Sequence, residues 1–346
     1  MSQPEPLLTI RCRTFNHVQF IRKCLDGFVM QQTTFPFEAV VHDDASTDGT
    51  ADIIREYAEK YPCIIKPILQ TENQWSKRDG SIGRILNAHT KGKYVAICEG
   101  DDYWTDPLKL QKQVDFLEAH PEYSICYHKV AVVNDDASVT KGHFPDWLPD
   151  KNATFDISDM EHRNIIQTNS VVYRWRFHEE QQQDYMWLGI LPGDWIMHLL
   201  HAAKGKIYYM PEVMGAYRHH DGGIWSVASK DDIVFYQRHG YAHALFFKNA
   251  RAVTPLRFEK PLRVLLENIA RVCLLDWNPE LLGKVRELFP EETDSVLASY
   301  VGKKNNKRTR FARQYAECMA MSSFLYRVSR FILRVYCLFS GRKLNN

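Results

Sequence analysis

The first third of the chain alternates between short apolar runs and longer stretches with apolar residues at helical spacing. The apolar runs, which predict β-strands, lie at residues 7–12, 39–42, 63–69 and 94–98. The helix-like stretches between them lie at residues 18–31, 50–61 and 81–90. Strands that alternate with helices in this way predict an α/β fold, with a mostly parallel sheet and helices on both faces.

The pattern is more varied after residue 100. Further elements are predicted as a helix at 108–119, strands at 123–133 and 165–173, a helix at 193–203 and a strand at 207–210. The polar, turn-rich stretch 134–160 predicts a long surface connection. From about residue 226 the chain is mostly helical, as at 261–275 and 279–288. These changes predict three parts: an α/β domain at 1–225, a helical extension at 226–300 and a separate C-terminal segment at 301–346.

Charge is distributed unevenly over a composition that is otherwise typical of a folded protein. Residues 301–346 hold 11 Lys or Arg residues and one acidic residue, Glu317, so this segment carries +10 and the remainder −8. The segment begins as a basic linker, and Arg327, Arg330 and Arg334 then share one face of a predicted helix at 323–339. The opposite face is apolar, which is typical of a helix lying in the interface of an anionic membrane. The alternative is a helix docked on the protein's own body or on a second subunit.

Cysteine usage and the N-terminus indicate where the protein resides. None of the eight cysteines forms a CxxC pair, and most lie in apolar segments, which predicts buried, reduced thiols. We find no signal peptide, and no window has the roughly 18 apolar residues that a membrane-spanning helix needs. We therefore expect a cytoplasmic protein, peripheral to the membrane through residues 323–339.

Two acidic clusters follow predicted strands. HDDASTDGT occupies residues 42–50 after the second strand, and EGDD occupies residues 99–102 after the fourth. Ligands of open parallel sheets bind beyond the carboxyl ends of the strands, and carboxylates crowded there are costly unless a cation compensates them. Hard oxygen ligands in this number predict Mg²⁺ or Mn²⁺. The alternative is a pair of solvated turns that cap helices.

The order of the motifs resembles that of the family 2 glycosyltransferases of the GT-A fold. The matching segments are TFNH at 14–17, VVHDDASTDGT at 40–50, KGKYVAICEGDDYW at 91–104 and GDW at 193–195. EGDDYWTDPLKLQKQ at 99–113 and YRHHDGGIWS at 217–226 are most similar to a bacterial branch that builds surface polysaccharides. The resemblance covers about residues 7–225 and implies a GT-A domain over 1–225.

The resemblance also implies a donor site for a nucleotide sugar, most simply a UDP-sugar. Thr14 and Asn16 match the residues that cradle the base, and Asp43 and Asp44 match the pair that contacts base and ribose. Glu99 occupies the first position of the family's acidic triplet, where Asp is usual, and would face the ribose or the metal. A cation before the fourth strand, for which we favour Arg84 over Lys77 and Arg78, would pair with the diphosphate.

A metal site and a catalytic base complete what the resemblance implies. Asp101 matches the ligand that holds the cation against the diphosphate, with Asp102 as an alternative ligand and His220 as a late histidine that completes the site. Asp194 matches the base that removes the proton of the acceptor hydroxyl during inversion. A carboxylate at a helix N-terminus is favoured by the helix dipole, which predicts a lowered pKa and leaves a plain helix cap as the alternative.

These expectations combine into an inverting, metal-dependent glycosyltransferase whose acceptor is a saccharide or a lipid-linked molecule at the inner face of the cell membrane. The main alternative is a catalytically inactive module that binds a nucleotide sugar. A nucleotidyltransferase would have a glycine-rich basic loop after the first strand, and residues 11–18 contain no glycine. The acidic body and the lack of a basic aromatic surface oppose a nucleic-acid partner.

Overall fold

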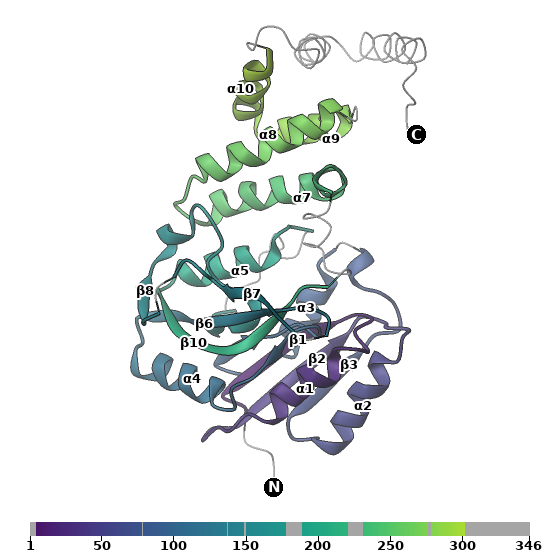
Figure 1. Ribbon diagram of the computed structural model, residues 1–346, viewed down its shortest axis with the longest axis vertical. Coiled ribbons are helices and arrows are strands. Elements are labelled where there is room, and N and C mark those ends of the chain that lie inside the picture. Colours follow the sequence, from purple (N-terminus) through teal and green to yellow (C-terminus); the bar gives the residue numbers. More distant parts are fainter. Residues whose placement is uncertain are drawn as a thin grey trace. The chain divides into compact units, whose positions relative to one another are not determined.

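The computed structural model describes residues 5–77, 79–136, 138–148, 150–177, 189–220, 231–275 and 278–301. Ten strands in these ranges form one sheet, whose main path runs β3-β2-β1-β4-β9-β6-β10-β5 (Figure 1). The α/β fold class predicted from the pattern is confirmed, and so is a helical region at the C-terminal end. The predicted helix at 323–339 lies outside the described residues.

The first part of the sheet is parallel, as predicted. Its elements follow the chain as β1 (Leu8–Thr14), α1 (Ile21–Val29), β2 (Phe37–Asp43), α2 (Thr50–Lys60), β3 (Ile65–Leu69), α3 (Ser81–Ala88) and β4 (Tyr94–Ile97). In this parallel ladder Thr14 is the register partner of Asp43, and Arg11 is the register partner of Ile97. The loops that carry the first three sequence motifs therefore all lie at the carboxyl-terminal ends of these parallel strands.

Helices cover both faces of this part because β1 has buried residues on both of its sides. Ile10 and Cys12 face a core to which α1, α2 and α4 (Lys109–Ala119) contribute. Arg11 faces the opposite side, where its Nη1 donates to Asn87 of α3 at 3.0 Å. On that same side Tyr173 stacks on His201 of α5 (Gly193–Ala202), with ring centroids 4.1 Å apart. Successive side chains of a strand point to opposite faces, so both helical layers follow from one alternating strand.

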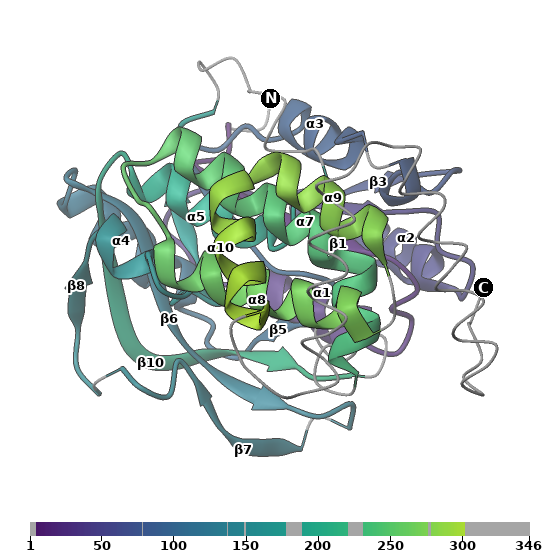
Figure 2. The same ribbon diagram turned by 90° about the horizontal axis from the view of Figure 1, so that it is seen from above.

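The second part of the sheet is mixed. It contains β9 (Val172–Arg174), β6 (Tyr123–Val133), β10 (Lys206–Arg218) and β5 (Tyr103–Trp104), with β6 and β10 parallel and β9 antiparallel to both β4 and β6. Two additional strands, β7 (Val139–Phe144) and β8 (Ala153–Phe155), pair antiparallel with β6 and β10. Figure 2 shows β6 and β10, with β7 and β8 beside them, on the side of the sheet away from β3.

Three predictions for this second part need correction. The stretch 134–160 is not only a surface connection, because it contains β7, β8 and the 3-10 helix Ile157–Met160. The strand predicted at 165–173 starts only at Val172, after a 3-10 turn at Thr168–Ser170. β10 runs to Arg218 rather than ending at residue 210, with register shifts against β6 between Met210 and Gly215. Short antiparallel strands pair through their backbone, so a polar sequence does not reveal them.

The cysteines largely match the prediction. The six described cysteines form no disulfide with one another, and five of them are buried. Cys63, the first residue of the predicted third strand, is exposed, because β3 starts two residues later at Ile65. Within the described residues no helix has the length and apolarity needed to cross a bilayer.

The C-terminal helices are α7 (Asp232–Val253), α8 (Glu259–Leu275), α9 (Pro279–Leu288) and α10 (Pro290–Val301). The chain divides into two compact units, one of residues 1–231 and 245–261 and the other of residues 232–244 and 262–346. Inside the second unit, Asn268 of α8 donates to the hydroxyl of Tyr236 at 3.2 Å. The domain boundaries at 225 and 300 stay a prediction, since α7 itself continues from one unit into the other.

Candidate active site

Three loops meet at the carboxyl edge of the parallel strands. Gly100 donates its backbone N–H to the carbonyl of Arg13 at 2.9 Å, which joins the acidic loop after β4 to the end of β1. Asp44 donates its N–H to the carbonyl of Thr14 at 3.0 Å, which joins the loop after β2 to the same strand. The structure thus brings together TFNH, HDDASTDGT and EGDD, which are separate in the sequence.

The loop after β1 is fixed by side-chain hydrogen bonds to its neighbour. Asn16 has a φ of 54°, in the left-handed region that Asn tolerates better than most residues. Its Oδ1 accepts from the N–H of Thr47 at 2.9 Å, and its own N–H donates to Ser46 Oγ at 2.8 Å. Thr14 is 3% exposed, and within the described residues its hydroxyl has no hydrogen-bond partner. Thr14 and Asn16, both predicted to bind the nucleotide sugar, therefore lie next to each other at the site, and the hydroxyl of Thr14 is available to hydrogen-bond a ligand.

The two carboxylates after β2 are buried and already hold parts of the protein. Asp43 Oδ2 accepts from the N–H of Ser46 at 3.0 Å and Asp43 Oδ1 from its hydroxyl at 2.5 Å, which closes the turn. Asp44 accepts from the backbone N–H groups of Gln74 at 2.7 Å and Trp75 at 3.0 Å. A carboxylate has about four acceptor positions, so each retains capacity for a ligand beyond these bonds.

Glu99 does not stand alone as a free acid, because it forms an ion pair with Arg13. Arg13 lies one residue before the end of β1, on the side of the strand that faces α5. Its pKa is raised, chiefly by the charge of Glu99, with a smaller contribution from Asp194. Arg13 was not among the residues predicted from the sequence. The signal was present in the alternation of β1, where Arg11 and Arg13 occupy the face opposite Ile10 and Cys12.

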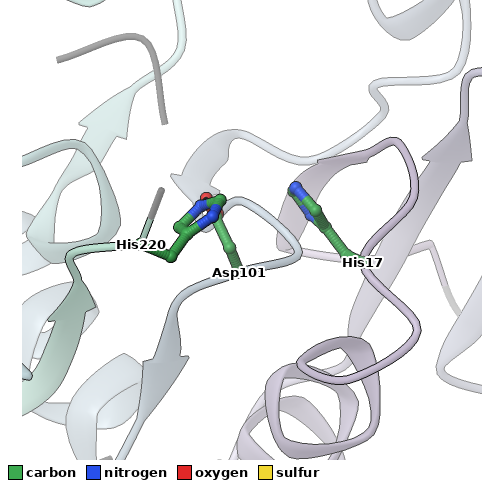
Figure 3. Close-up of side chains that lie close together, drawn as sticks. All are labelled: His17, Asp101 and His220. Atoms are coloured by element: carbon green, nitrogen blue, oxygen red, sulfur yellow. The ribbon is translucent and has the colours of Figure 1, made fainter. Parts of the chain in front are cut away.

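Asp101 lies in a cluster with two histidines (Figure 3). His220 Nε2 is 2.9 Å from Asp101 Oδ2, and one ligand atom each of His17, Asp101 and His220 lie within 4.8 Å of one another. Burial alone would raise the pKa of Asp101, but the hydrogen bond to His220 and the charges of both histidines outweigh it and lower that pKa. The pKa of His220 is raised, chiefly by its hydrogen bond to Asp101. The structure therefore unites the predicted Asp101 and His220 and adds His17, which had not been proposed as a ligand.

Asp102 is directed elsewhere. Its Oδ1 accepts the backbone N–H of Arg218 at 2.8 Å, and it does not belong to the metal-ligating cluster found among the described residues. Burial raises its pKa well above the usual range, and the charge of Asp101 adds to this. The side chain of Arg218 donates to the carbonyls of Asp101 at 2.9 Å, Asn134 at 2.8 Å and Asp135 at 2.7 Å. Asp102 and Arg218 thus hold the acidic loop against β6 and β10.

Asp194 lies in the first turn of α5 and is half-buried. Its Oδ2 accepts from Asn164 Nδ2 at 3.1 Å and from Thr168 Oγ1 at 3.2 Å. The N-cap of α5 is Pro192 rather than Asp194. The predicted lowering of the pKa is wrong: burial raises it, and the negative charge of Glu99 raises it further. The cost of removing the carboxylate from water exceeds the benefit of the helix dipole.

The cations before β4 are engaged locally. Arg84 Nη1 donates to the carbonyl of Asp79 at 2.7 Å, and its Nη2 is 3.7 Å from Asp79 Oδ2. Lys77 Nζ is 3.3 Å from Glu72 Oε2. Arg78 and residues 221–230, with most of the predicted YRHHDGGIWS motif, lie outside the described residues. The predicted role of Arg84 at a diphosphate therefore has no support from its contacts.

Comparisons with known proteins indicate the family to which the chain is similar. Residues 13–181 match the model of the family described as Glycosyl transferase family 2. An uncharacterized protein of Mycobacterium tuberculosis, Rv1520, is 42% identical over 233 residues, which are 67% of this chain and 64% of that protein. The chain thus spans 64% of the length of this relative. EpsE of Bacillus subtilis, named as a glycosyltransferase, is 38% identical over 97 residues, which are 28% of this chain and 34% of EpsE.

A solved structure shares the fold over most of the chain. Residues 1–349 of TarS from Staphylococcus aureus, in complex with UDP, superpose with a TM-score of 0.56 and 17% sequence identity. The superposition covers 89% of this chain and 87% of the TarS chain. At this level of identity the likeness extends to the fold, and the chemistry has to be argued from the residues described above.

Proposed function

Because this chain belongs to glycosyl transferase family 2, which its residues 13–181 match, we propose that it is an inverting, divalent-metal-dependent glycosyltransferase. It would transfer a sugar from a nucleotide-sugar donor to a saccharide or lipid-linked acceptor during synthesis of a cell-surface polysaccharide. The observation that carries the proposal is the combination of a carboxylate–imidazole pair, Asp101 and His220, with a carboxylate of raised pKa, Asp194. Arg13 lies between the acidic loop and Asp194, because it forms an ion pair with Glu99 and the charge of Asp194 contributes to raising its pKa.

The residues around Asp101 fit a divalent cation. Asp101 and His220 offer an oxygen and a nitrogen 2.9 Å apart, and their mutual hydrogen bond can be exchanged for bonds to an ion. Mg²⁺ or Mn²⁺ held there would stabilise the negative charge that develops on the departing diphosphate. Asp102 accepts a hydrogen bond from the backbone of Arg218, which fixes the acidic loop against β10, so we assign Asp102 a positioning role.

Asp194 is the proposed base. It would accept the proton of the acceptor hydroxyl as the hydroxyl oxygen bonds to the anomeric carbon and the bond from that carbon to the diphosphate breaks. Burial brings the pKa of this carboxylate closer to neutral pH, and a general base is most effective when its pKa lies near the pH of the reaction. The hydrogen bonds from Asn164 and Thr168 to Oδ2 hold the carboxylate in one orientation.

We propose UDP as the nucleotide, bound by Thr14, Asn16, Asp43 and Asp44 with Glu99 near the ribose. TarS, which shares the fold, has been solved with UDP and with UDP-GlcNAc, and this supports the choice. Thr14 contributes a buried hydroxyl that has no hydrogen-bond partner within the described residues, and Asp43 and Asp44 retain acceptor positions. Arg84 is the weakest member of the predicted donor set, because its guanidinium already pairs with Asp79.

The acceptor and the cellular location are proposed from the relatives and from the tail. TuaG of Bacillus subtilis, named for teichuronic acid biosynthesis, is 31% identical over 119 residues, 34% of this chain and 44% of TuaG. EpsE and TuaG favour an acceptor in surface-polysaccharide synthesis. The basic helix predicted at 323–339 would hold the enzyme at the inner face of the membrane, close to a lipid-linked acceptor.

Release of free nucleotide from UDP-, GDP- and dTDP-sugars, measured with and without Mn²⁺, tests the proposal. We expect turnover of a UDP-sugar that requires the cation and is lost in Asp101→Asn. Turnover that survives chelation would contradict the metal-dependent reaction. Nucleotide-sugar binding without any release, across the panel and with acceptors present, would favour the inactive binding module.

A further inference from the structure

We propose that His17 is a third protein ligand of the cation, so that the site presents two imidazoles and one carboxylate and binds Co²⁺, Zn²⁺ and Mn²⁺ in preference to Mg²⁺. The inference rests on the proposed function only in that a divalent cation occupies this edge of the sheet. Imidazole nitrogen is a ligand for transition metals and zinc, whereas Mg²⁺ favours carboxylates, carbonyls and water.

The spacing of the three side chains suits one ion. Their ligand atoms lie within 4.8 Å of one another, and Asp101 and His220 are already 2.9 Å apart. Two atoms bound to opposite sides of one such ion are separated by about 4 Å, since each bond is about 2.0–2.2 Å long. Small rotations of the side chains are enough to close the set. Figure 3 shows the His17 ring opposite the Asp101–His220 pair.

The ring of His17 has an unused nitrogen. Its Nδ1 is buried and makes no hydrogen bond within the described residues. Leaving such a group without a partner costs about 1–3 kcal/mol, so a role in packing alone would leave this cost uncompensated. The acidic loop makes room for the ring with a glycine: a Cβ at Gly100 would lie 3.0 Å from this nitrogen.

The surroundings hold His17 in a defined position. Its backbone N–H donates to Thr50 Oγ1 at 2.9 Å, and its carbonyl accepts from the N–H groups of Phe20 at 2.9 Å and Ile21 at 2.8 Å. The ring of Phe20 lies 6.2 Å from the ring of His17 and 5.2 Å from that of His220, measured between centroids. The backbone of one loop and a shared aromatic neighbour therefore restrict both imidazoles before any ion binds.

Metal titration of the full chain without donor or acceptor tests the inference. Co²⁺ binding followed by visible absorption, and Mn²⁺ binding followed by calorimetry, would be compared in wild type, His17→Ala, His17→Gln and His220→Ala. We expect the three variants to lose at least about tenfold in affinity, since even residues that only support a ligand cost about 10–100-fold. His219→Ala is the matched control, because His219 is the sequence neighbour of His220 outside the cluster, and it should bind like wild type.

Spin-echo spectra of bound Mn²⁺ add a readout that a structural role would not change. Two coordinated nitrogens are expected in wild type and one in His17→Gln, which retains a side chain of similar size. Equal affinity and two nitrogens in His17→Gln would overturn the assignment, and equal binding of Mg²⁺ and Co²⁺ to wild type would overturn the metal preference. Loss of sugar transfer alone would leave these measurements unaffected, so the inference and the proposed function can fail separately.

Discussion

Gly100 separates Glu99 from Asp101, and the structure predicts that even a methyl group at this position will displace the acidic loop. A Cβ at residue 100 would lie 2.6 Å from Thr14 Oγ1 and 2.7 Å from Thr14 Cβ. Non-bonded carbon atoms prefer about 3.5–4.0 Å, so one of the two loops has to move by roughly 1 Å. Both contacts involve a β-branched side chain at the end of a buried strand, which cannot swing away freely.

Overpacking of this kind costs about 1–3 kcal/mol, and the lower chain entropy of Ala relative to Gly returns about 0.4–1 kcal/mol of it. We therefore expect Gly100→Ala to lower the free energy of unfolding by about 1–2 kcal/mol in urea titrations followed by tryptophan fluorescence. Cation affinity and nucleotide release should fall as well, because Asp101 is the next residue.

A control and a rescue make this test specific. Gly283 lies within α9, and a methyl group added there would have no heavy atom of the described residues within 4 Å, so Gly283→Ala should raise the stability by about 0.5–1 kcal/mol. Thr14→Gly removes the two closest atoms, so combining it with Gly100→Ala should cost less than the sum of the single changes. Wild-type stability in Gly100→Ala, or strict additivity in the double variant, would refute the reasoning.

Three further predictions concern catalysis, pH and the tail. Asp194→Asn should retain UDP and Mn²⁺ binding in calorimetry but lose about 10²–10⁴-fold in kcat, and the acid limb of the wild-type kcat profile should lie above the pKa of a free aspartate because burial raises the pKa of Asp194. Burial lowers the pKa of Lys109 to about 7. In the unfolded state the lysine has a pKa of about 10.4, so between about pH 7 and pH 10.4 the unfolded state binds more protons than the folded state. The free energy of unfolding should therefore rise over this range by up to about 1.4 kcal/mol per pH unit, and Lys109→Met should remove this rise. Truncation after Val301 should release the protein from anionic vesicles in sedimentation assays while UDP binding survives.

Each of these predictions has an outcome that contradicts it. Full transfer activity in Asp194→Asn would remove the base assignment. An unchanged pH slope in Lys109→Met, judged against the neighbouring variant Lys112→Met, would mean that another group titrates. Equal vesicle binding before and after truncation would favour docking of the tail on protein.

The sequence predicted the parallel half of the sheet well, and the physical reason is burial. β1, β2 and β4 are covered on both sides by helices, so each appears as a short apolar run whose neighbours have helical spacing. β7 and β8 could not be found in this way. They are held by backbone pairing to β6 and β10, and at six and three residues they are too short for a period to stand out in the sequence.

The candidate site could be predicted to the level of loops but not of individual side chains. Asp101 and Asp102 are adjacent in the sequence, yet one faces two histidines and the other the backbone N–H of Arg218. Nothing in the string EGDD distinguishes them, because the direction of each depends on β10, more than a hundred residues later. His17 was missed for the same reason, since its partners in the cluster come from other loops.

The bonds from Asp44 to the backbone of residues 74 and 75 have a consequence for how the sequence of this segment can vary. The Asp44 carboxylate accepts hydrogen bonds from backbone N–H groups, which every residue except proline provides, and not from the side chains of Gln74 and Trp75. Trp75 meanwhile presents a large ring that is 42% exposed. The backbone at residues 74 and 75 is therefore held through groups that do not depend on the identity of their side chains, so the exposed residue at position 75 can be exchanged while both of these hydrogen bonds are kept.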